Sequence, residues 1–159
     1  NNLQKQDKET IIIFRNYSSS NIKIDKLIKL KNFLRKQGNK FFLANNFKLA
    51  LKLGLDGVYI PSFNKNFNHL AYSIFPNFTI VGSAHNLKEI RIKELQKAKV
   101  IFISSLFKKN NNYLGLNKFK ILNNYTKKEV VALGGISKKS IKKIKLLKIS
   151  GIAGISYFR

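Results

Sequence analysis

Short apolar runs alternate with amphipathic stretches along the whole chain, a pattern typical of parallel β/α units. One amphipathic stretch predicts a helix from Asp25 to about Lys36, with Asp25 as its N-cap and Gly38 at its end. The apolar runs predict seven strands, at Ile11–Phe14, Phe41–Ala44, Gly57–Ile60, Thr79–Gly82, Val100–Ile103, Val130–Leu133 and from Gly151 onward.

Cap residues predict where the other helices begin. We expect Asn46 to cap a helix that reaches Leu53, and Asn86 with Glu89 to form a capping box for a helix to about Ala98. The remaining predictions are helices at Gly115–Tyr125 and Ser137–Lys148, a helical turn near Leu70–Ile74 with His69 at the surface, and a mobile loop at Ser104–Asn112.

Seven parallel strands with intervening helices predict an α/β fold, a (β/α)8 TIM barrel that lacks its first β/α unit and its last helix in this chain. A full barrel needs at least about 200 residues, and the chain has 159 and does not begin with Met. A doubly wound sheet is the alternative, but its phosphate loop usually follows the first strand. We therefore expect one barrel domain over residues 1–159 that is incomplete at both ends.

The composition narrows the class of protein. Cysteine is absent, which excludes disulfides and thiolate metal sites. No apolar run is long enough to span a bilayer, and nothing resembles a secretory signal. We expect a cytoplasmic protein with no membrane partner.

The formal net charge of +24 would ordinarily point to nucleic acid. Here the lysines are spread along every predicted helix, and Lys, Asn, Ile and Phe are abundant together, as an AT-rich genome produces. We expect no specific nucleic-acid partner, while the positive field would attract anionic metabolites.

The segment EVVALGGIS at Glu129–Ser137, followed by GIAGISYF at Gly151–Phe158, carries the strongest local signal. Gly134 and Gly135 let the backbone approach a ligand closely. Ser137 is predicted to cap the next helix and leave its amides aimed at an anion. Barrels often bind phosphate at the loops after their last two strands. The alternative is an ordinary strand-to-helix turn.

The predicted carboxyl ends of the strands, where barrels place their chemistry, are polar, with one cation and no carboxylate. This composition disfavours a tightly held Mg²⁺ and paired-carboxylate catalysis, so we expect no protein-held metal and no tightly bound cofactor. The residues are Arg15, Asn16, Tyr17, Asn45, Asn46, Ser62, Asn64, Ser83, His85, Ser104, Ser105, Gly134, Gly135 and Ser156.

Four segments in order, LALKLGLDGVYI (Leu49–Ile60), VGSAHNLKEI (Val81–Ile90), VVALGGIS (Val130–Ser137) and GIAGIS (Gly151–Ser156), resemble the thiamine-phosphate synthase/TenI family. The resemblance implies a β/α barrel that acts on phosphorylated small molecules. Synthase members join hydroxymethylpyrimidine pyrophosphate to thiazole phosphate and release pyrophosphate. TenI-type members bind the thiazole, and some isomerise it.

The resemblance also implies roles for single residues. Arg15 matches an arginine that contacts the pyrophosphate, and Ser83 matches a serine beside it; these two are the expected catalytic residues. Gly134, Gly135 and Ser156 match the positions that hold the thiazole phosphate.

Several positions depart from the family pattern. The two Mg²⁺-binding aspartates fall at Asn45 and Asn64, which we expect to contact substrate, so that Mg²⁺ would arrive only with the pyrophosphate. Lys109 stands in the loop that binds substrate in the family, and the TenI-type catalytic histidine falls at Ser105. His85 either touches ligand, carries a proton or serves packing.

The function expected from these residues is a thiamine-phosphate synthase. A non-catalytic or regulatory thiazole-phosphate-binding protein of the TenI type is the alternative, and a basic RNA-associated protein is the third. The oligomeric state is left open.

Overall fold

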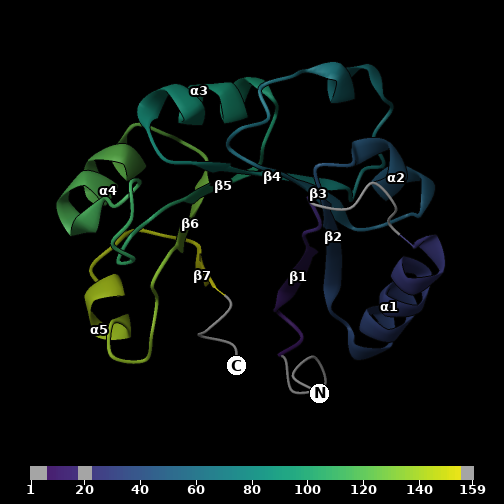
Figure 1. The fold of residues 1–159 in the computed structure, drawn as a ribbon, viewed down its shortest axis with the longest axis horizontal. Helices are drawn as coiled ribbons and strands as arrows, with labels where there is room; N and C mark the ends of the chain where they lie inside the picture. Colours follow the sequence, from purple (N-terminus) through teal and green to yellow (C-terminus); the bar gives the residue numbers. More distant parts are fainter. Residues whose placement is uncertain (1–6, 18–22, 155–159) are drawn as a thin grey trace. The chain divides into compact units, whose positions relative to one another are not determined.

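The computed structural model describes residues 7–17 and 23–154, which fall into two compact units, Asn1–Ile80 and Val81–Arg159. Strands and helices alternate along each unit (Figure 1). The first unit contains β1 (Ile11–Phe14), α1 (Ile24–Gln37), β2 (Lys40–Ala44), α2 (Phe47–Lys52), β3 (Gly57–Ile60) and a 3-10 turn at Asn68–Ala71. The second contains α3 (Leu87–Leu95), β5 (Val100–Ile103), α4 (Gly115–Asn124), β6 (Glu129–Leu133), α5 (Ile141–Ile144) and β7 (Gly151–Ala153), and β4 (Thr79–Ala84) leads into it.

In the first unit, β1, β2 and β3 pair in parallel in the order of the chain. The side chains of Phe41, Phe42 and Leu43 in β2 are each 1% exposed. A strand buried on both faces is typical of a parallel sheet covered by helices. The parallel pairing places the carboxyl ends of the three strands side by side.

Helix α1 ends as expected but begins differently. Gly38 closes it with φ +79°, a left-handed conformation that glycine adopts without strain. Asp25 is not its N-cap, because the helix already begins at Ile24 and Lys23 occupies the cap without a side-chain hydrogen bond. Asp25 instead lies in the first turn, where the helix dipole stabilises a carboxylate.

In the second unit, β4, β5, β6 and β7 also pair in parallel in chain order. β4 runs two residues further than the sequence predicts and ends at Ala84, which places Ser83 inside the strand, opposite Phe102. No helix in the described ranges is long and apolar enough to cross a membrane.

The helix predicted at Ser137–Lys148 is wrong in extent, because α5 is a single turn at Ile141–Ile144. The Ser140 hydroxyl accepts from the amide of Ser137 (2.9 Å) and donates to its carbonyl (3.0 Å), so a local turn replaces the first helical turn. Clustered lysines at 138, 139, 142 and 143 further disfavour a longer helix through like-charge repulsion. Ser137 therefore does not cap a helix.

Candidate functional site

Arg15 and Tyr17, which follow β1, and Phe63, which follows β3, lie at the carboxyl ends of these strands in the first unit. Arg15 and Tyr17 follow β1 and are exposed. The ring of Tyr17 meets that of Phe63 edge to face, with centroids 5.5 Å apart. Partial burial, assisted by Tyr59, raises the pKa of Tyr17 to about 12, and the nearby Arg15 guanidinium opposes the rise. Tyr17 therefore stays a neutral phenol beside a cation at neutral pH.

Asn45 and Asn64, which follow β2 and β3, are joined directly. The Asn64 Nδ2 donates to the Asn45 Oδ1 at 2.7 Å. The backbone N–H of Asn66 donates to the Asn64 Oδ1 at 2.9 Å, and this fixes the orientation of the Asn64 amide, because an N–H must meet an oxygen. Both side-chain oxygens of the pair thus accept hydrogen bonds. Asn45 adopts φ +58°, a left-handed conformation that asparagine tolerates.

A cavity of about 200 Å³ lies at this edge of the first unit. Among residues 7–17 and 23–154, its lining consists of neutral amides, aromatic and aliphatic side chains, one lysine and one histidine, with no carboxylate. The lining residues are Asn45, Asn46, Phe47, Lys48, Val58, Ile60, Asn64, Asn66, Asn68, His69 and Tyr72.

His69 lies at the cavity and not at the surface, where the sequence analysis expects it. Its side chain is 5% exposed, and its ring packs against Phe47 at a centroid distance of 5.2 Å. Phe47 also stacks with Tyr72 and meets Phe78 edge to face. This aromatic cluster buries the histidine. It is assembled from segments more than 20 residues apart, which periodicity does not reveal.

In the second unit, Ser83 points away from helix α3. A Cβ on Gly82 would meet the Lys93 side chain of α3 at 2.7 Å, so position 82 faces that helix. Successive side chains of a strand alternate between its faces, and Ser83 therefore faces the opposite side of β4. Ser83 is 4% exposed.

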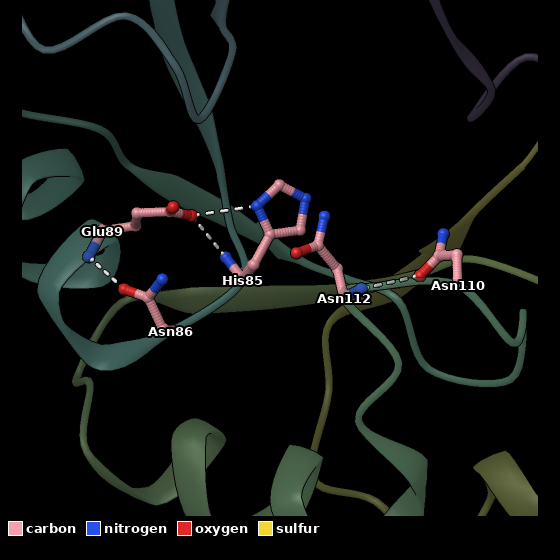
Figure 2. A network of polar contacts seen from close by, with 5 residues as sticks. All are labelled: His85, Asn86, Glu89, Asn110 and Asn112. Atoms are coloured by element: carbon pink, nitrogen blue, oxygen red, sulfur yellow. Dashed lines mark hydrogen bonds and ion pairs between the residues drawn. The ribbon is translucent and has the colours of Figure 1, made fainter.

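His85 is held by the start of α3 (Figure 2). Asn86 caps the helix by accepting from the Glu89 amide at 2.9 Å, as expected. The Glu89 carboxylate accepts from the His85 amide (2.7 Å) and contacts the His85 Nδ1 (3.0 Å), so it bonds one residue before the Asn86 amide that the predicted capping box would use. Asn112 points toward the other side of the ring in Figure 2. These contacts account for a structural role of His85, and its Nε2 is the ring nitrogen that does not face Glu89.

Gly134 and Gly135 follow β6 with φ of +104° and +70° and hold the segment 105–108 of their own unit. The amides of Phe107 and Lys108 donate to the Gly134 carbonyl at 2.8 and 3.3 Å. A Cβ on Gly135 would meet the Lys108 nitrogen at 2.5 Å. The glycines thus permit a close approach of backbone to backbone. Gly135 is also exposed, and its amide has no hydrogen-bond acceptor within residues 7–17 and 23–154.

The remaining residues predicted for the site differ in their exposure, and one of them is not described by the structure. Ser105 is buried, and its Oγ donates to the Lys108 carbonyl at 3.0 Å. Lys109 is exposed on the same loop. Ser156 lies outside the described residues. Within the described ranges, no group of three or more His, Asp or Glu side chains could hold a metal ion.

Lys48, Asn66 and Asn68 also line the cavity and are not among the residues predicted from the sequence. Asn66 follows Asn64 by two residues, the spacing at which an asparagine side chain accepts from a backbone amide. That spacing is a usable signal for Asn66. Lys48 has no such signal, because only the fold brings it to the cavity.

Comparison with known proteins gives a consistent picture. The family model for thiamine monophosphate synthase matches residues 4–158. The chain is 30% identical over 120 residues to a thiamine-phosphate synthase of Methanococcus vannielii, covering 73% of this chain and 58% of that protein. It is 26% identical over 139 residues to the Methanococcus maripaludis synthase, covering 82% of this chain and 67% of that protein. The chain thus spans about three fifths to two thirds of the length of these relatives.

Solved structures establish the fold. The thiamine phosphate pyrophosphorylase of Pyrococcus furiosus superposes with a TM-score of 0.76 at 24% identity, over 98% of this chain and 76% of that one. FabK of Thermotoga maritima gives a TM-score of 0.71 at 13% identity, over 94% of this chain and 50% of that one. The α/β fold of the TIM-barrel type is confirmed, and residues 7–17 and 23–154 contain the seven predicted strands.

Proposed function

Because the chain belongs to the thiamine monophosphate synthase family, we propose that it joins hydroxymethylpyrimidine pyrophosphate to thiazole phosphate. The products would be thiamine phosphate and pyrophosphate. The observation that carries this proposal is the placement of polar and glycine residues at the carboxyl ends of successive parallel strands, where this fold concentrates its chemistry.

Each unit offers groups for one part of this chemistry. In the first unit, Arg15 is the exposed cation beside the neutral Tyr17 phenol, suited to the charge of a departing pyrophosphate. In the second unit, the backbone amide of Gly135, an exposed residue, suits the phosphate of the thiazole. Ser83 is assigned to the pyrophosphate through the resemblance alone.

The bond changes require no protein base. The bond between the pyrimidine methylene carbon and the pyrophosphate oxygen breaks, and pyrophosphate leaves with the electron pair. The thiazole ring nitrogen then donates its lone pair to the methylene carbon and becomes a cationic ring nitrogen, with no proton to lose. The residues named above bind and orient the reactants and stabilise the leaving group.

A protein-held Mg²⁺ does not fit the residues present. Mg²⁺ prefers carboxylate oxygens, whereas the positions that match the family's aspartates are Asn45 and Asn64, whose oxygens already accept hydrogen bonds. Any Mg²⁺ would therefore arrive with the pyrophosphate, and no step of the reaction is assigned to a metal bound by the protein.

The direct test mixes purified full chain with both precursors, with and without Mg²⁺, and follows thiamine phosphate by chromatography. The expected result is product formation that depends on both precursors and is lost in Arg15→Ala. Absence of product from a folded chain that still binds thiazole phosphate would favour the second candidate.

The second candidate is a thiazole-phosphate-binding protein without turnover. The Asn45–Asn64 pair favours it, because the pair lacks the negative charge that assists a metal-dependent reaction. Titration calorimetry with thiazole phosphate alone separates the two candidates when it is combined with the turnover assay.

A further inference from the structure

The side-chain amides of Asn45 and Asn64, at the cavity of the first unit, have a defined orientation. The Asn66 N–H fixes the Asn64 oxygen, so the Asn64 Nδ2 must face Asn45. The Asn45 oxygen meets this donor, and the Asn45 Nδ2 therefore turns away from Asn64 with two N–H donors to offer. Asn45 is exposed and lines the cavity. The Asn45 Nδ2 is therefore the group of the pair that points away from it and can donate to a ligand.

The charged groups around the asparagine pair also favour an anion over a cation. Lys48 and the buried His69 line the cavity, and none of the lining residues that the structure describes carries a carboxylate. A carboxylate would be the expected counterpart of a cation, whereas a lysine and oriented amide donors stabilise an anion. The formal net charge of +24 adds to this field.

The size of the cavity suits a small group. Its volume of about 200 Å³ is several times the roughly 30 Å³ that one water occupies in the liquid. A phosphoryl group fits such a volume, and the stacked rings of Phe47 and Tyr72 form part of its lining.

We propose that this cavity binds a phosphoryl group directly through the Asn45 amide and Lys48, without a divalent cation. The identity of the natural ligand, the diphosphate of the pyrimidine substrate, rests on the proposed function; the binding of the anion itself does not. Recognition by this edge of the first unit would then differ from metal bridging between carboxylates, because hydrogen-bond donors take the place of the cation.

The experiment titrates inorganic pyrophosphate into the full chain by calorimetry, once in EDTA and once in Mg²⁺. We expect binding in EDTA that is at least as tight as in Mg²⁺. In Asn64→Asp, the new carboxylate still accepts from Asn66 but cannot donate to Asn45. Affinity in EDTA should fall at least about tenfold, which corresponds to about 1.4 kcal/mol, and Mg²⁺ should restore part of it.

Two further variants complete the design. Asn45→Gly removes the amide donors while it keeps the left-handed backbone, and should weaken pyrophosphate binding at least about fivefold (roughly 1 kcal/mol). Asn117→Asp places the same added charge on the exposed face of α4 in the other unit and should change affinity less than about twofold. Circular dichroism confirms that each variant is folded.

The outcomes separate this inference from the proposed function. Pyrophosphate binding that requires Mg²⁺ in the unmodified chain, or equal losses in Asn64→Asp and Asn117→Asp, would overturn the inference even if thiamine phosphate is formed. Metal-free binding that Asn64→Asp abolishes would support it even if no turnover is observed, in which case the synthase proposal fails alone.

Discussion

The edges at the carboxyl ends of the strands are built differently in the two units. In the first unit, side chains determine the geometry: Asn64 is held by Asn66 and in turn holds Asn45. In the second unit, the absence of side chains determines it: Gly134 and Gly135 admit the backbone of residues 105–108. A substitution can replace one side-chain hydrogen bond with another. A glycine in close contact with backbone atoms tolerates almost no substitution, because any Cβ would clash.

The largest effect should come from the glycine edge. Gly135→Asp places a Cβ within 2.5 Å of the Lys108 nitrogen and adds negative charge where we propose that phosphate binds. We expect thiazole-phosphate affinity to fall at least about a hundredfold, roughly 3 kcal/mol, measured by calorimetry. Gly135→Ala separates bulk from charge.

Gly115→Ala is the matched control for this change. Gly115 also has a positive φ, +65°, but its nearest neighbour is the flexible side chain of Tyr113 at 3.2 Å. It should show the backbone strain of about 1 kcal/mol without a loss of ligand affinity. Unchanged affinity in a folded Gly135→Asp would remove the glycine edge as a phosphate site.

Lys93 shows a second use of glycine in the second unit, because its side chain occupies the space that the missing Gly82 side chain leaves free. Its side chain is fully buried, with Nζ 2.8 Å from the Gln96 Oε1, and burial lowers its pKa to about 8, opposed by Glu89. The unfolded lysine titrates near 10.5, so burial of the charge destabilises the native state below pH 8, and stability should rise between pH 8 and 10.5.

Lys93→Met should abolish this pH dependence. The difference in unfolding free energy between variant and wild type should shift by roughly 2 kcal/mol in favour of wild type between pH 7 and pH 10, at about 1.4 kcal/mol per pH unit. Urea unfolding at both pH values measures it. Lys88→Met, an exposed lysine on the same helix, is the control and should show no such shift. Parallel curves for the wild type and Lys93→Met would contradict the prediction.

The asparagine edge should be convertible to a metal site. Asn45→Asp combined with Asn64→Asp sets two carboxylates side by side where the amides are now 2.7 Å apart. Their mutual repulsion and their oxygens favour a hard divalent cation. We expect Mg²⁺ affinity to rise at least about tenfold, about 1.4 kcal/mol, and turnover to rise if the precursors react on this chain.

Asn117→Asp combined with Asn124→Asp adds the same charge to the exposed face of α4 and controls for net charge. Calorimetric titration with MgCl₂ compares the two double variants. Equal Mg²⁺ affinity in both would show that the edge of the first unit has no special geometry for a cation.

The smallest effect concerns the start of α3. Asn86→Ala removes the side-chain acceptor of the Glu89 amide and should lower the unfolding free energy by about 1 kcal/mol. Asn86→Asp keeps the cap and should leave stability nearly unchanged. A loss as large in the Asp variant would mean that the Asn86 amide nitrogen, and not the cap, is what matters.

Local pattern was sufficient for most of the secondary structure. The strands at Ile11–Phe14, Gly57–Ile60 and Val100–Ile103 begin and end where the sequence predicts, and Asn46 and Asn86 cap their helices as expected. The signals lie within a few residues of one another, because strand alternation, helical spacing and capping are short-range effects.

Two predictions from the sequence are wrong, one where local signals compete and one where distant residues decide burial. The Ser137–Lys148 stretch has a helical pattern, but the Ser140 hydroxyl and clustered lysines reduce the helix to one turn. The aromatic cluster around Phe47 buries His69. The residues next to His69 in the chain do not indicate this burial, because Phe47 is 22 residues away.

For the candidate site, too, the sequence predicts which residues follow the strands but not the contacts between them. The sequence alone determined that polar and glycine residues follow the strands, and its resemblance to the family predicts that Asn45 and Asn64 stand at the positions of the Mg²⁺-binding aspartates. Only the tertiary structure decided that these two amides, 19 residues apart, are hydrogen-bonded, and that Gly135 faces the backbone of Lys108. The reason is physical: parallel pairing of β2 with β3 and of β5 with β6 aligns strand ends from distant parts of the chain, and the contacts made there depend on register and loop path, which no local periodicity encodes.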